Sequence, residues 1–262
     1  MDIIQALTDE LKLKREQVEK TVALIDEGNT IPFIARYRKE ETGSLDDTVL
    51  RNLEDRLNYL RNIEKRKEEV RNLINEQGKL TDEIAAAIER AVTITEVDDI
   101  YRPFRPHRKT RASVAREKGL EPLAALAELI LRQDDRYEPS LAVQAQAYVN
   151  EELGVSSAEE ALAGACDIIA EQISDDAGFR KVIRKSTFDT GFLNTKNTKD
   201  EDSVYSQYYD YSEKIGKIPA HRILAINRGE KEEFLKVTIT VEKGMILNYL
   251  CGEMIRNPKS EA

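Results

Sequence analysis

The chain has 262 residues, 34% charged and 40% hydrophobic, which is enough for one large domain or two ordinary domains with a real core. No stretch approaches the roughly 18 consecutive apolar residues that a membrane span needs. The first residues, MDII, carry neither the basic nor the apolar part of a secretion signal. We therefore expect a cytoplasmic protein without a membrane partner.

The net charge of −9 disfavours the surface as a whole for binding a polyanion. The charge is unevenly spread, because residues 1–118 hold 23 Lys/Arg and 24 Asp/Glu, whereas residues 119–262 hold 17 and 25. We expect any nucleic-acid contact in the first half and protein contacts in the acidic second half.

Apolar residues recur at helical spacing over residues 2–13 and again over 15–27, where Gly28 ends the second helix. A third helix is expected within residues 31–40, IPFIARYRKE, with Thr30 as its cap and a proline in its first turn. Two helices joined by a short glycine-containing turn give the outline of a helix-turn-helix.

The third helix suits either core packing or nucleic-acid binding. On a helical wheel its basic residues do not share one face, and its N-terminal residues are apolar, which makes them poor readers of bases. We predict that it packs through Phe33, Ile34 and Tyr37 and turns Arg36 and Lys39 to solvent. The alternative is a nucleic-acid contact by three basic residues: Arg36, Arg38 and Lys39.

A long helix is predicted over residues 45–77, capped by Ser44 and stopped by Gly78. At 1.5 Å per residue, about 33 residues span roughly 50 Å, which is longer than a compact domain usually needs. An apolar seam runs through its first half and fails in the charged stretch EKRKEE, residues 64–69. The seam consists of Leu50, Leu53, Leu57 and Leu60. We interpret the helix as a strut with a solvated middle, whose two ends pack on different partners.

The most charged stretch is YRPFRPHRKTRASVAREK, residues 101–118, which holds seven Lys/Arg and one acid. Pro103 and Pro106 forbid a regular helix at its start. Arginine side chains beside aromatic rings suit phosphates and stacking on bases. The candidate nucleic-acid-binding residues here are Arg102, Arg105, Arg108, Lys109 and Arg111. The alternative is that these arginines bridge the acidic half of the same protein.

Metal and catalytic chemistry find no support in the sequence. Cys166 and Cys251 lie far apart, with no Cys-x-x-Cys motif and no histidine at ligand spacing, so we predict two buried free thiols. His107 and His221 are isolated, and there is no phosphate-binding glycine loop and no paired nucleophile and base. We predict no enzyme, no metal and no cofactor.

The second half is predicted to contain helices over residues 122–131, 157–172 and 176–193, the second of which begins with a Ser157…Glu160 capping box. Residues 194–203 are typical of a polar loop. Four tyrosines follow within YSQYYDY, and half-buried positions at a helical interface are the ordinary interpretation.

One more helix is predicted between Pro219 and Gly229, and the alternating stretch LKVTITVE, residues 235–242, is the one clear strand. A lone strand is unstable, so it needs partners from residues 245–250 or from beyond residue 262. The sequence thus predicts a mainly α fold with a helix-turn-helix-like part, a long central helix and a minor β element near the C-terminus. We place the domain boundary between residues 1–120 and 121–262.

Several long phrases resemble the N-terminal part of the bacterial Tex family, the transcription accessory proteins related to a eukaryotic transcription elongation factor. They are DEGNTIPFIARYRKEETGSLDD, LNYLRNIEKRKEEV, EQGKLTDEI, YRPFRPHRKTRASVAREKGLEPLA and EKIGKIPAHRILAINRGEKEEFLKV. The resemblance covers nearly the whole chain. It implies a mostly helical region that is cut before a nuclease-like domain, a helix-hairpin-helix segment and an RNA-binding OB-fold domain.

Two functions from different classes follow. The first is a non-enzymatic module of a transcription accessory protein that helps to hold RNA or DNA weakly and without sequence preference. The second is a protein-interaction scaffold that docks downstream domains of the same protein, or transcription machinery, without touching nucleic acid. We expect the basic stretch to carry the first function and the acidic half to carry the second.

Overall fold

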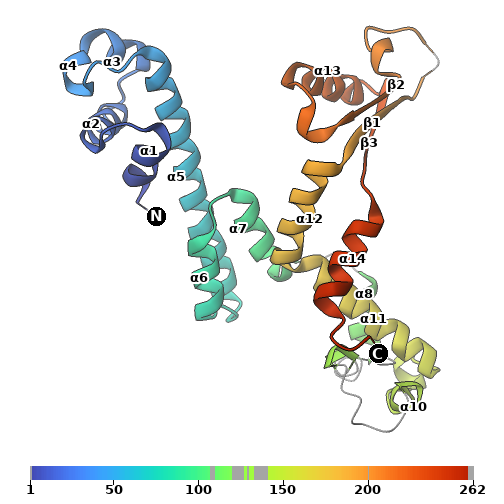
Figure 1. Cartoon of the computed structure of the whole chain (residues 1–262). Coiled ribbons are helices and arrows are strands. Elements are labelled where there is room, and N and C mark those ends of the chain that lie inside the picture. Colours follow the sequence, from blue (N-terminus) through green and yellow to red (C-terminus); the bar gives the residue numbers. More distant parts are fainter. Residues whose placement is uncertain are drawn as a thin grey trace. The chain divides into compact units, whose positions relative to one another are not determined.

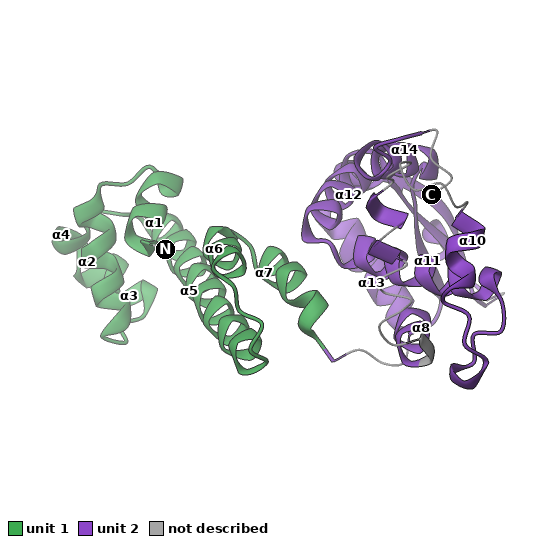
Figure 2. Ribbon diagram, turned by 90° about the horizontal axis from the view of Figure 1, so that it is seen from below, with its two compact units in different colours: residues 1–105 green, residues 106–262 purple. Residues whose placement is uncertain are grey.

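The computed structural model describes residues 2–106, 110–119, 127–128, 130–132, 141–199 and 201–258, except for the side chains of residues 118 and 119 (Figure 1). The chain divides into two compact units, residues 1–105 and 106–262 (Figure 2). This division falls within the basic stretch, and the domain boundary at residue 120 stays a prediction. The mainly helical fold with a small sheet near the C-terminus is confirmed.

The regular secondary structure of the described residues of unit 1 is entirely helical. Its elements are α1 (Ile3–Leu11), α2 (Arg15–Asp26), α3 (Ile31–Tyr37), α4 (Lys39–Thr42), α5 (Asp47–Glu76), α6 (Asp82–Arg90), α7 (Ile94–Tyr101) and the 3-10 turn η1 (Arg102–Phe104). Side-chain oxygens cap four of these helices by accepting the backbone N–H three residues on. The capping residues are Asp2, Asp46, Thr81 and Thr93.

The cap of the long helix differs from the prediction. Asp46, not Ser44, accepts the Val49 N–H at 2.8 Å, and Ser44 lies before the helix in a left-handed conformation with φ of 64°. Because Gly43 and Ser44 both have positive φ, the chain turns there before α5 begins. The predicted length of the helix is confirmed to within two residues at either end.

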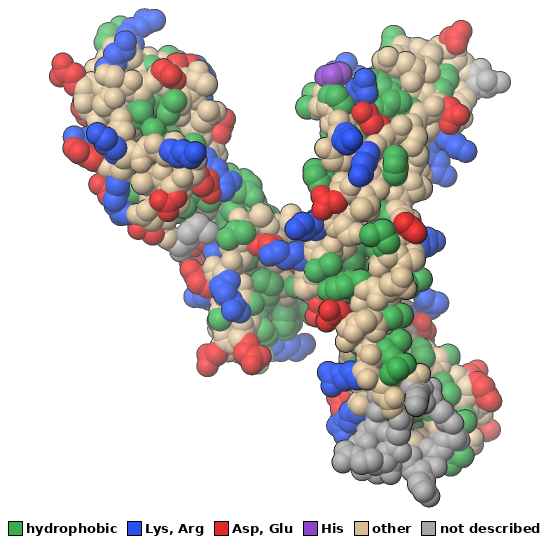
Figure 3. Space-filling model, viewed as in Figure 1, with side chains coloured by type: hydrophobic (Ala, Val, Ile, Leu, Met, Phe, Trp, Pro, Cys, Tyr) green, Lys and Arg blue, Asp and Glu red, His purple; other side chains and the backbone are tan. Residues whose placement is uncertain are grey.

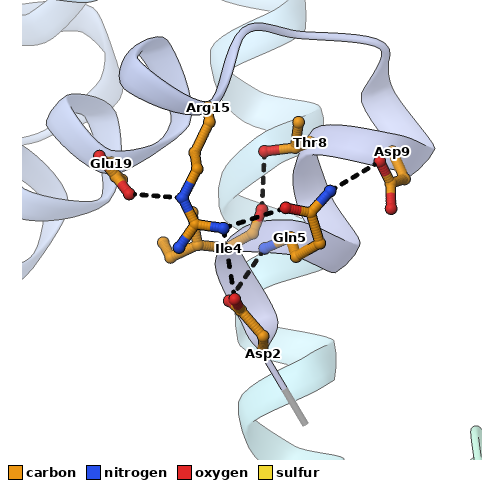
Figure 4. Close-up of polar contacts among 7 residues, drawn as sticks. All are labelled: Asp2, Ile4, Gln5, Thr8, Asp9, Arg15 and Glu19. Atoms are coloured by element: carbon orange, nitrogen blue, oxygen red, sulfur yellow. Dashed lines mark hydrogen bonds and ion pairs between the residues drawn. The ribbon is translucent and has the colours of Figure 1, made fainter.

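Arg15 fixes the first two helices to each other (Figure 4). Its guanidinium donates to Asp2 Oδ2 at 3.3 Å and to Gln5 Oε1 at 3.0 Å on α1, and to Glu19 Oε1 at 2.8 Å on its own helix. The Asp2 carboxylate also accepts the Gln5 N–H, and this hydrogen bond, with Arg15, lowers the pKa of Asp2. One cation therefore joins the start of α2 to the start of α1.

One face of α5 supplies the core of unit 1. Its buried residues follow one another at spacings of three and four: Leu50, Leu53, Leu57, Leu60, Ile63, Lys67, Val70 and Ile74. The first part of this stripe packs against α1, α2 and α3, and the last part packs against α6 and α7. The strut with two ends on different partners is confirmed.

The middle of α5 is not fully solvated, which corrects the prediction for EKRKEE. Lys67 is buried, and its Nζ donates to the carbonyl of Glu89 at 2.8 Å and lies 2.9 Å from Glu64 Oε1. The spacing 60–63–67 keeps the stripe on one face after Leu60, whereas a strict heptad would have passed to residue 64. Lys67 thus carries a charge inside the apolar stripe.

Unit 2 combines helices with the sheet. Its elements are α8 (Arg111–Gly119), α10 (Leu141–Gln146), η2 (Glu151–Leu153), α11 (Ala158–Asp175), α12 (Ala177–Thr190), β1 (Phe192–Asn197), η3 (Ser206–Tyr208), β2 (Asp210–Lys214), η4 (Ile215–Lys217), α13 (Ala220–Lys231), β3 (Leu235–Thr240) and α14 (Lys243–Met254). The Ser157 cap is confirmed, because Ser157 Oγ accepts the Glu160 N–H at 3.2 Å. Most of the predicted helix 122–131 lies outside the described residues.

The sheet has the order β2-β1-β3, with both pairs antiparallel. Strand β3 is confirmed, but its predicted partner is wrong, because residues 243–254 form α14 and the partner is β1. Part of the expected polar loop, residues 194–197, belongs to β1. Of the polar residues in this part of β1, Thr195 is buried, and its hydroxyl is satisfied because it donates to the Tyr208 carbonyl.

The tyrosines belong to a small core between the sheet and α13. Tyr205 and Tyr208 are buried together with Ile226 of α13 and Leu235 of β3. They lie in and beside η3 and not on a regular helix, so the predicted helical interface is confirmed only on the α13 side.

Both cysteines are exposed, so the prediction of buried thiols is wrong. On α11, Cys166 directly follows Ala165, one of the residues that helix buries, and so lies on the side turned from the core. On α14, which carries Cys251, no residue is buried. Among the described residues there is no group of three or more His, Cys, Asp or Glu that could hold a metal. None of the described helices is long and apolar enough to cross a bilayer.

Candidate nucleic-acid interface

The basic stretch 101–118 runs from the end of unit 1 into unit 2. With a proline at its centre, the first part forms η1, and Arg105 then continues in an extended conformation with ψ of 144°. Arg108 and Lys109 lie outside the described residues, as does His107. From Arg111 onward the stretch is helical. Its described cations therefore belong to different units, Arg102 and Arg105 to unit 1 and Arg111 and Arg116 to unit 2.

In unit 1, Arg105 is held by groups of its own unit. Its Nη2 lies 3.0 Å from Asp98 Oδ1, and its guanidinium carbon lies 5.4 Å from the centre of the Tyr101 ring. Arg66 of α5 pairs with the same carboxylate oxygen at 2.7 Å and faces the same ring at 5.8 Å. The neighbouring Arg102 is half-buried. Two guanidinium groups thus share one carboxylate and one ring.

In unit 2, the basic stretch forms most of α8, and side chains in and beside this helix contact α11. Arg116 pairs with Glu171, and Thr110 Oγ1 donates to the other oxygen of that carboxylate at 2.8 Å. Arg111 is held far more loosely, because its Nε lies 3.6 Å from Asp167 Oδ1 and its side chain is 88% exposed. The interpretation that arginines bridge acidic residues fits Arg116, whereas Arg111 remains open to a ligand.

A pocket of about 400 Å³ adjoins Arg111 between α8, α11 and the turn that follows η2. Besides Arg111, its polar lining includes two acids, Glu160 and Asp167, and the rest is mostly small and apolar. Because the carboxylates outnumber the cation, the pocket does not suit a phosphate.

The three cations predicted on the third helix are all exposed. Arg38 lies 3.3 Å from Glu41. Neither Arg36 nor Lys39 forms an ion pair within the described part of the chain. Their charge is thus available to an anion, in contrast to that of Arg105 and Arg116.

The aromatic residues of this helix do not pack into the core, which corrects the prediction. Ile31 and Ile34 are buried, whereas Phe33 and Tyr37 are 38% and 64% exposed. At 100° per residue the two rings lie roughly 110° around the helix from the isoleucines. A helix of seven residues buries only one narrow face, so the rings remain outside. The i,i+4 spacing of Phe33 and Tyr37 in the sequence already indicated that the two rings lie side by side on one face of the helix.

A second basic surface escaped the sequence analysis because charge was averaged over whole halves. Residues 177–199 hold six Lys/Arg and one acid, within the half that carries the net negative charge. On α12, the cations Lys181, Arg184 and Lys185 are exposed. Figure 3 shows Lys and Arg side chains over the part of unit 2 where α12 lies. A count over a short window would have found them.

Comparison with known proteins identifies two family models along the chain. The model described as Tex-like protein N-terminal domain matches residues 1–75, and the model described as Tex central region-like matches residues 136–257. Together they cover 75 and 122 residues, which is about three quarters of the chain. The basic stretch 101–118 lies between them.

Relatives match almost the whole length of the chain. Protein YdcI of Bacillus subtilis is 48% identical over 257 residues, which is 97% of this chain and 35% of the relative. Transcriptional accessory protein Tex of Neisseria gonorrhoeae is 40% identical over 91% of this chain and 31% of its own length. S1 RNA-binding domain-containing protein 1 of Homo sapiens is 29% identical over 98% of this chain and 26% of its own length. The chain therefore spans about a third of the length of such relatives.

Proposed function

The chain belongs to the Tex family, and from this premise we propose that it is a non-enzymatic module through which a transcription accessory protein holds nucleic acid and organises its domains. The names of two relatives support this proposal, one as a transcriptional accessory protein and the other as a protein with an S1 RNA-binding domain. A cytoplasmic location is part of the same proposal. Because this chain spans only about a third of those relatives, their activity as whole proteins enters here as part of the proposal as well.

The observation that carries the proposal is the exposed charge of the basic stretch. Arg111 is 88% exposed and only loosely paired, and pairs of this kind contribute about 0–1 kcal/mol. A phosphate oxygen can replace Asp167 at little cost and releases counterions in doing so. The residues proposed to contact phosphates are Arg102, Arg105, Arg108, Lys109 and Arg111, with Arg36, Arg38 and Lys39 as a second group.

The chemistry of these contacts gives binding without sequence preference. Guanidinium and ammonium groups that touch phosphates position a nucleic acid but do not read its bases. The affinity should then fall steeply with salt, by about 0.7–0.9 logarithmic units per phosphate contact and decade of salt concentration. RNA and DNA of equal length should bind with similar salt dependence.

The test is fluorescence anisotropy of labelled single-stranded RNA and duplex DNA with this chain between about 50 and 200 mM salt. One variant replaces Arg105, Arg108, Lys109 and Arg111 with alanine. A charge-matched control replaces four exposed lysines outside the proposed surfaces: Lys65, Lys79, Lys231 and Lys236. The first variant should bind weakly with a slope reduced by up to about three, whereas the control should keep the wild-type slope. Equal slopes for the two variants would contradict the proposal.

Exposed apolar side chains of unit 2 favour a second candidate function, namely protein docking. Leu224 on α13, Ile239 on β3 and Leu247 on α14 are all more than half exposed. The three side chains lie on separate elements, and a protein partner that covered them would remove large apolar surface from water. The partners proposed here are downstream domains of the same protein or transcription machinery.

Titration against purified RNA polymerase tests this second candidate. The variant without the four basic-stretch cations should retain the partner, and Leu224→Ser with Ile239→Thr should weaken it. Loss of the partner on neutralising the basic stretch alone would count against a scaffold that acts through unit 2.

A further inference from the structure

Two exposed aromatic rings lie side by side on α3. The ring centres of Phe33 and Tyr37 are 5.2 Å apart, with 46° between the ring planes. The helix is anchored beneath them by Ile31 and Ile34, which are buried against α5 and the end of α2. The rings therefore sit on a fixed support, and both remain partly exposed to solvent.

Cations surround this pair of rings. The guanidinium carbon of Arg38 lies 5.7 Å from the centre of the Phe33 ring, and that of Arg36 lies 6.0 Å from the centre of the Tyr37 ring. Lys39 follows directly and is exposed. A ligand that fits this surface must offer flat apolar faces and negative charge together, and unpaired bases on a phosphate backbone do so.

We propose that Phe33 and Tyr37 form a platform on which unpaired bases of a single-stranded nucleic acid stack, while Arg36, Arg38 and Lys39 contact the flanking phosphates. This inference rests on the proposed nucleic-acid function and narrows it to single strands at this surface. It adds two aromatic residues to the site and gives the helix a role other than reading a groove.

Single strands suit the platform better than a duplex does. In a duplex the base faces are already stacked on one another, so exposed rings gain nothing without unpairing. The N-terminal residues of α3, which would enter a groove in a DNA-reading helix, are Ile31, which is buried, and Pro32, which has no donor. Sequence preference should be weak, because every base has a face that can stack.

A local structural role is the competing explanation. Two apolar side chains at i and i+4 stabilise a helix whether or not they are aromatic. Leucine separates the two roles, because it keeps apolar contact and helix propensity but has no ring face. The variant is therefore Phe33→Leu with Tyr37→Leu. The matched control is Phe188→Leu on α12, where the aromatic side chain is 57% exposed.

The assay is anisotropy with a labelled oligouridylate of about 16 nucleotides and with an RNA duplex of the same length at one moderate salt concentration. Loss of two stacking rings should weaken single-strand binding by about five- to a hundredfold. Duplex binding and the helical circular dichroism should stay at wild-type values, and Phe188→Leu should change neither. Tyr37→Phe keeps a ring and should bind like the wild type.

Each failure has its own meaning. If the wild type binds neither probe, the proposed nucleic-acid function fails and the platform fails with it. If the wild type binds with a steep salt slope and the double leucine variant binds the single strand equally well, the platform alone is overturned. An equal loss for single strand and duplex also overturns it, as does a double variant that loses only a protein partner. Should the double variant unfold, Tyr37→Leu alone gives the same test, since this side chain is the more exposed.

Discussion

Lys67→Met removes the one charge that the described part of α5 carries within its buried stripe. The Lys67 side chain is 4% exposed, and its Nζ reaches the Glu89 carbonyl at 2.8 Å and Glu64 Oε1 at 2.9 Å. Methionine has a similar length and fills the same space, so little cavity forms. The substitution therefore isolates the loss of the polar contacts.

The magnitude follows from how far the remaining groups are buried. Leaving one partner of a fully buried ion pair alone costs about 3–5 kcal/mol, and an exposed pair contributes about 0–1 kcal/mol. Glu64 is 29% exposed and lies between these limits, because water can reach part of its carboxylate. The Glu89 carbonyl at the end of α6 also loses a charged donor. We expect a loss of about 2 kcal/mol in the free energy of unfolding of unit 1, or roughly 10 °C in its Tm.

Thermal unfolding of the whole chain by circular dichroism measures the shift, and amide exchange in α5 and α6 assigns it to unit 1. Lys65→Met is the matched control, since Lys65 is exposed two residues earlier on the same helix. It should change stability by less than about 0.5 kcal/mol. Adding Glu64→Gln to Lys67→Met should recover part of the loss, because the uncompensated charge is gone. If Lys67→Met is as mild as the control, Lys67 does not hold α6 to α5.

Two further predictions concern a glycine and an ion pair. Gly229→Ala should destabilise unit 2 by about 1–2 kcal/mol in chemical unfolding. The new Cβ would lie 2.7 Å from Leu235 Cδ1, and this overpacking outweighs the gain in helix propensity. Gly252→Ala, with nothing within 4 Å of its new Cβ, should be neutral or stabilising, and equal effects would contradict the close approach. Hydrogen bonds from Arg61 at 2.7 and 2.8 Å lower the pKa of Asp26 below its ordinary 3.8. The ion pair therefore stabilises the folded state above pH 3.8, and this stabilisation is lost as the pH falls through the lowered pKa. Arg61→Gln should therefore cost at most about 1 kcal/mol at pH 7 and less near pH 3, and a cost that does not change with pH would refute this origin.

Local signals in the sequence were enough for the elements that local chemistry determines. The long helix, the cap at Ser157, and strand β3 all follow from residues within one or two turns of each other. The partner of β3 could not be found in this way, because β1 precedes it by about 40 residues and part of β1 reads as a polar loop. Strand pairing is a long-range contact, and the local sequence of β1 does not indicate which strand it pairs with.

The buried state of Lys67 and the exposed state of Tyr37 have one physical cause. At these two positions, burial follows from which face of the helix meets a neighbour and outweighs the hydrophobicity of the side chain itself. Lys67 continues the stripe of α5 and finds the carbonyl end of α6, whereas Tyr37 lies off the narrow buried face of a seven-residue helix. Composition and propensity predicted the reverse at both positions.

The candidate site divides in the same way between residues that the fold uses and residues that it leaves open. Arg116 and Arg105 have carboxylates within their own units, so a phosphate would have to displace a contact that already exists. Arg36 and Lys39 have no ion pair within the described residues, so a phosphate meets them without competition. Charge density along the sequence pointed to the basic stretch, and availability of charge in the structure keeps Arg111 there and adds Arg36 on α3 and Lys39 on α4. A cation contributes to nucleic-acid binding only to the extent that the folded protein has not already neutralised it.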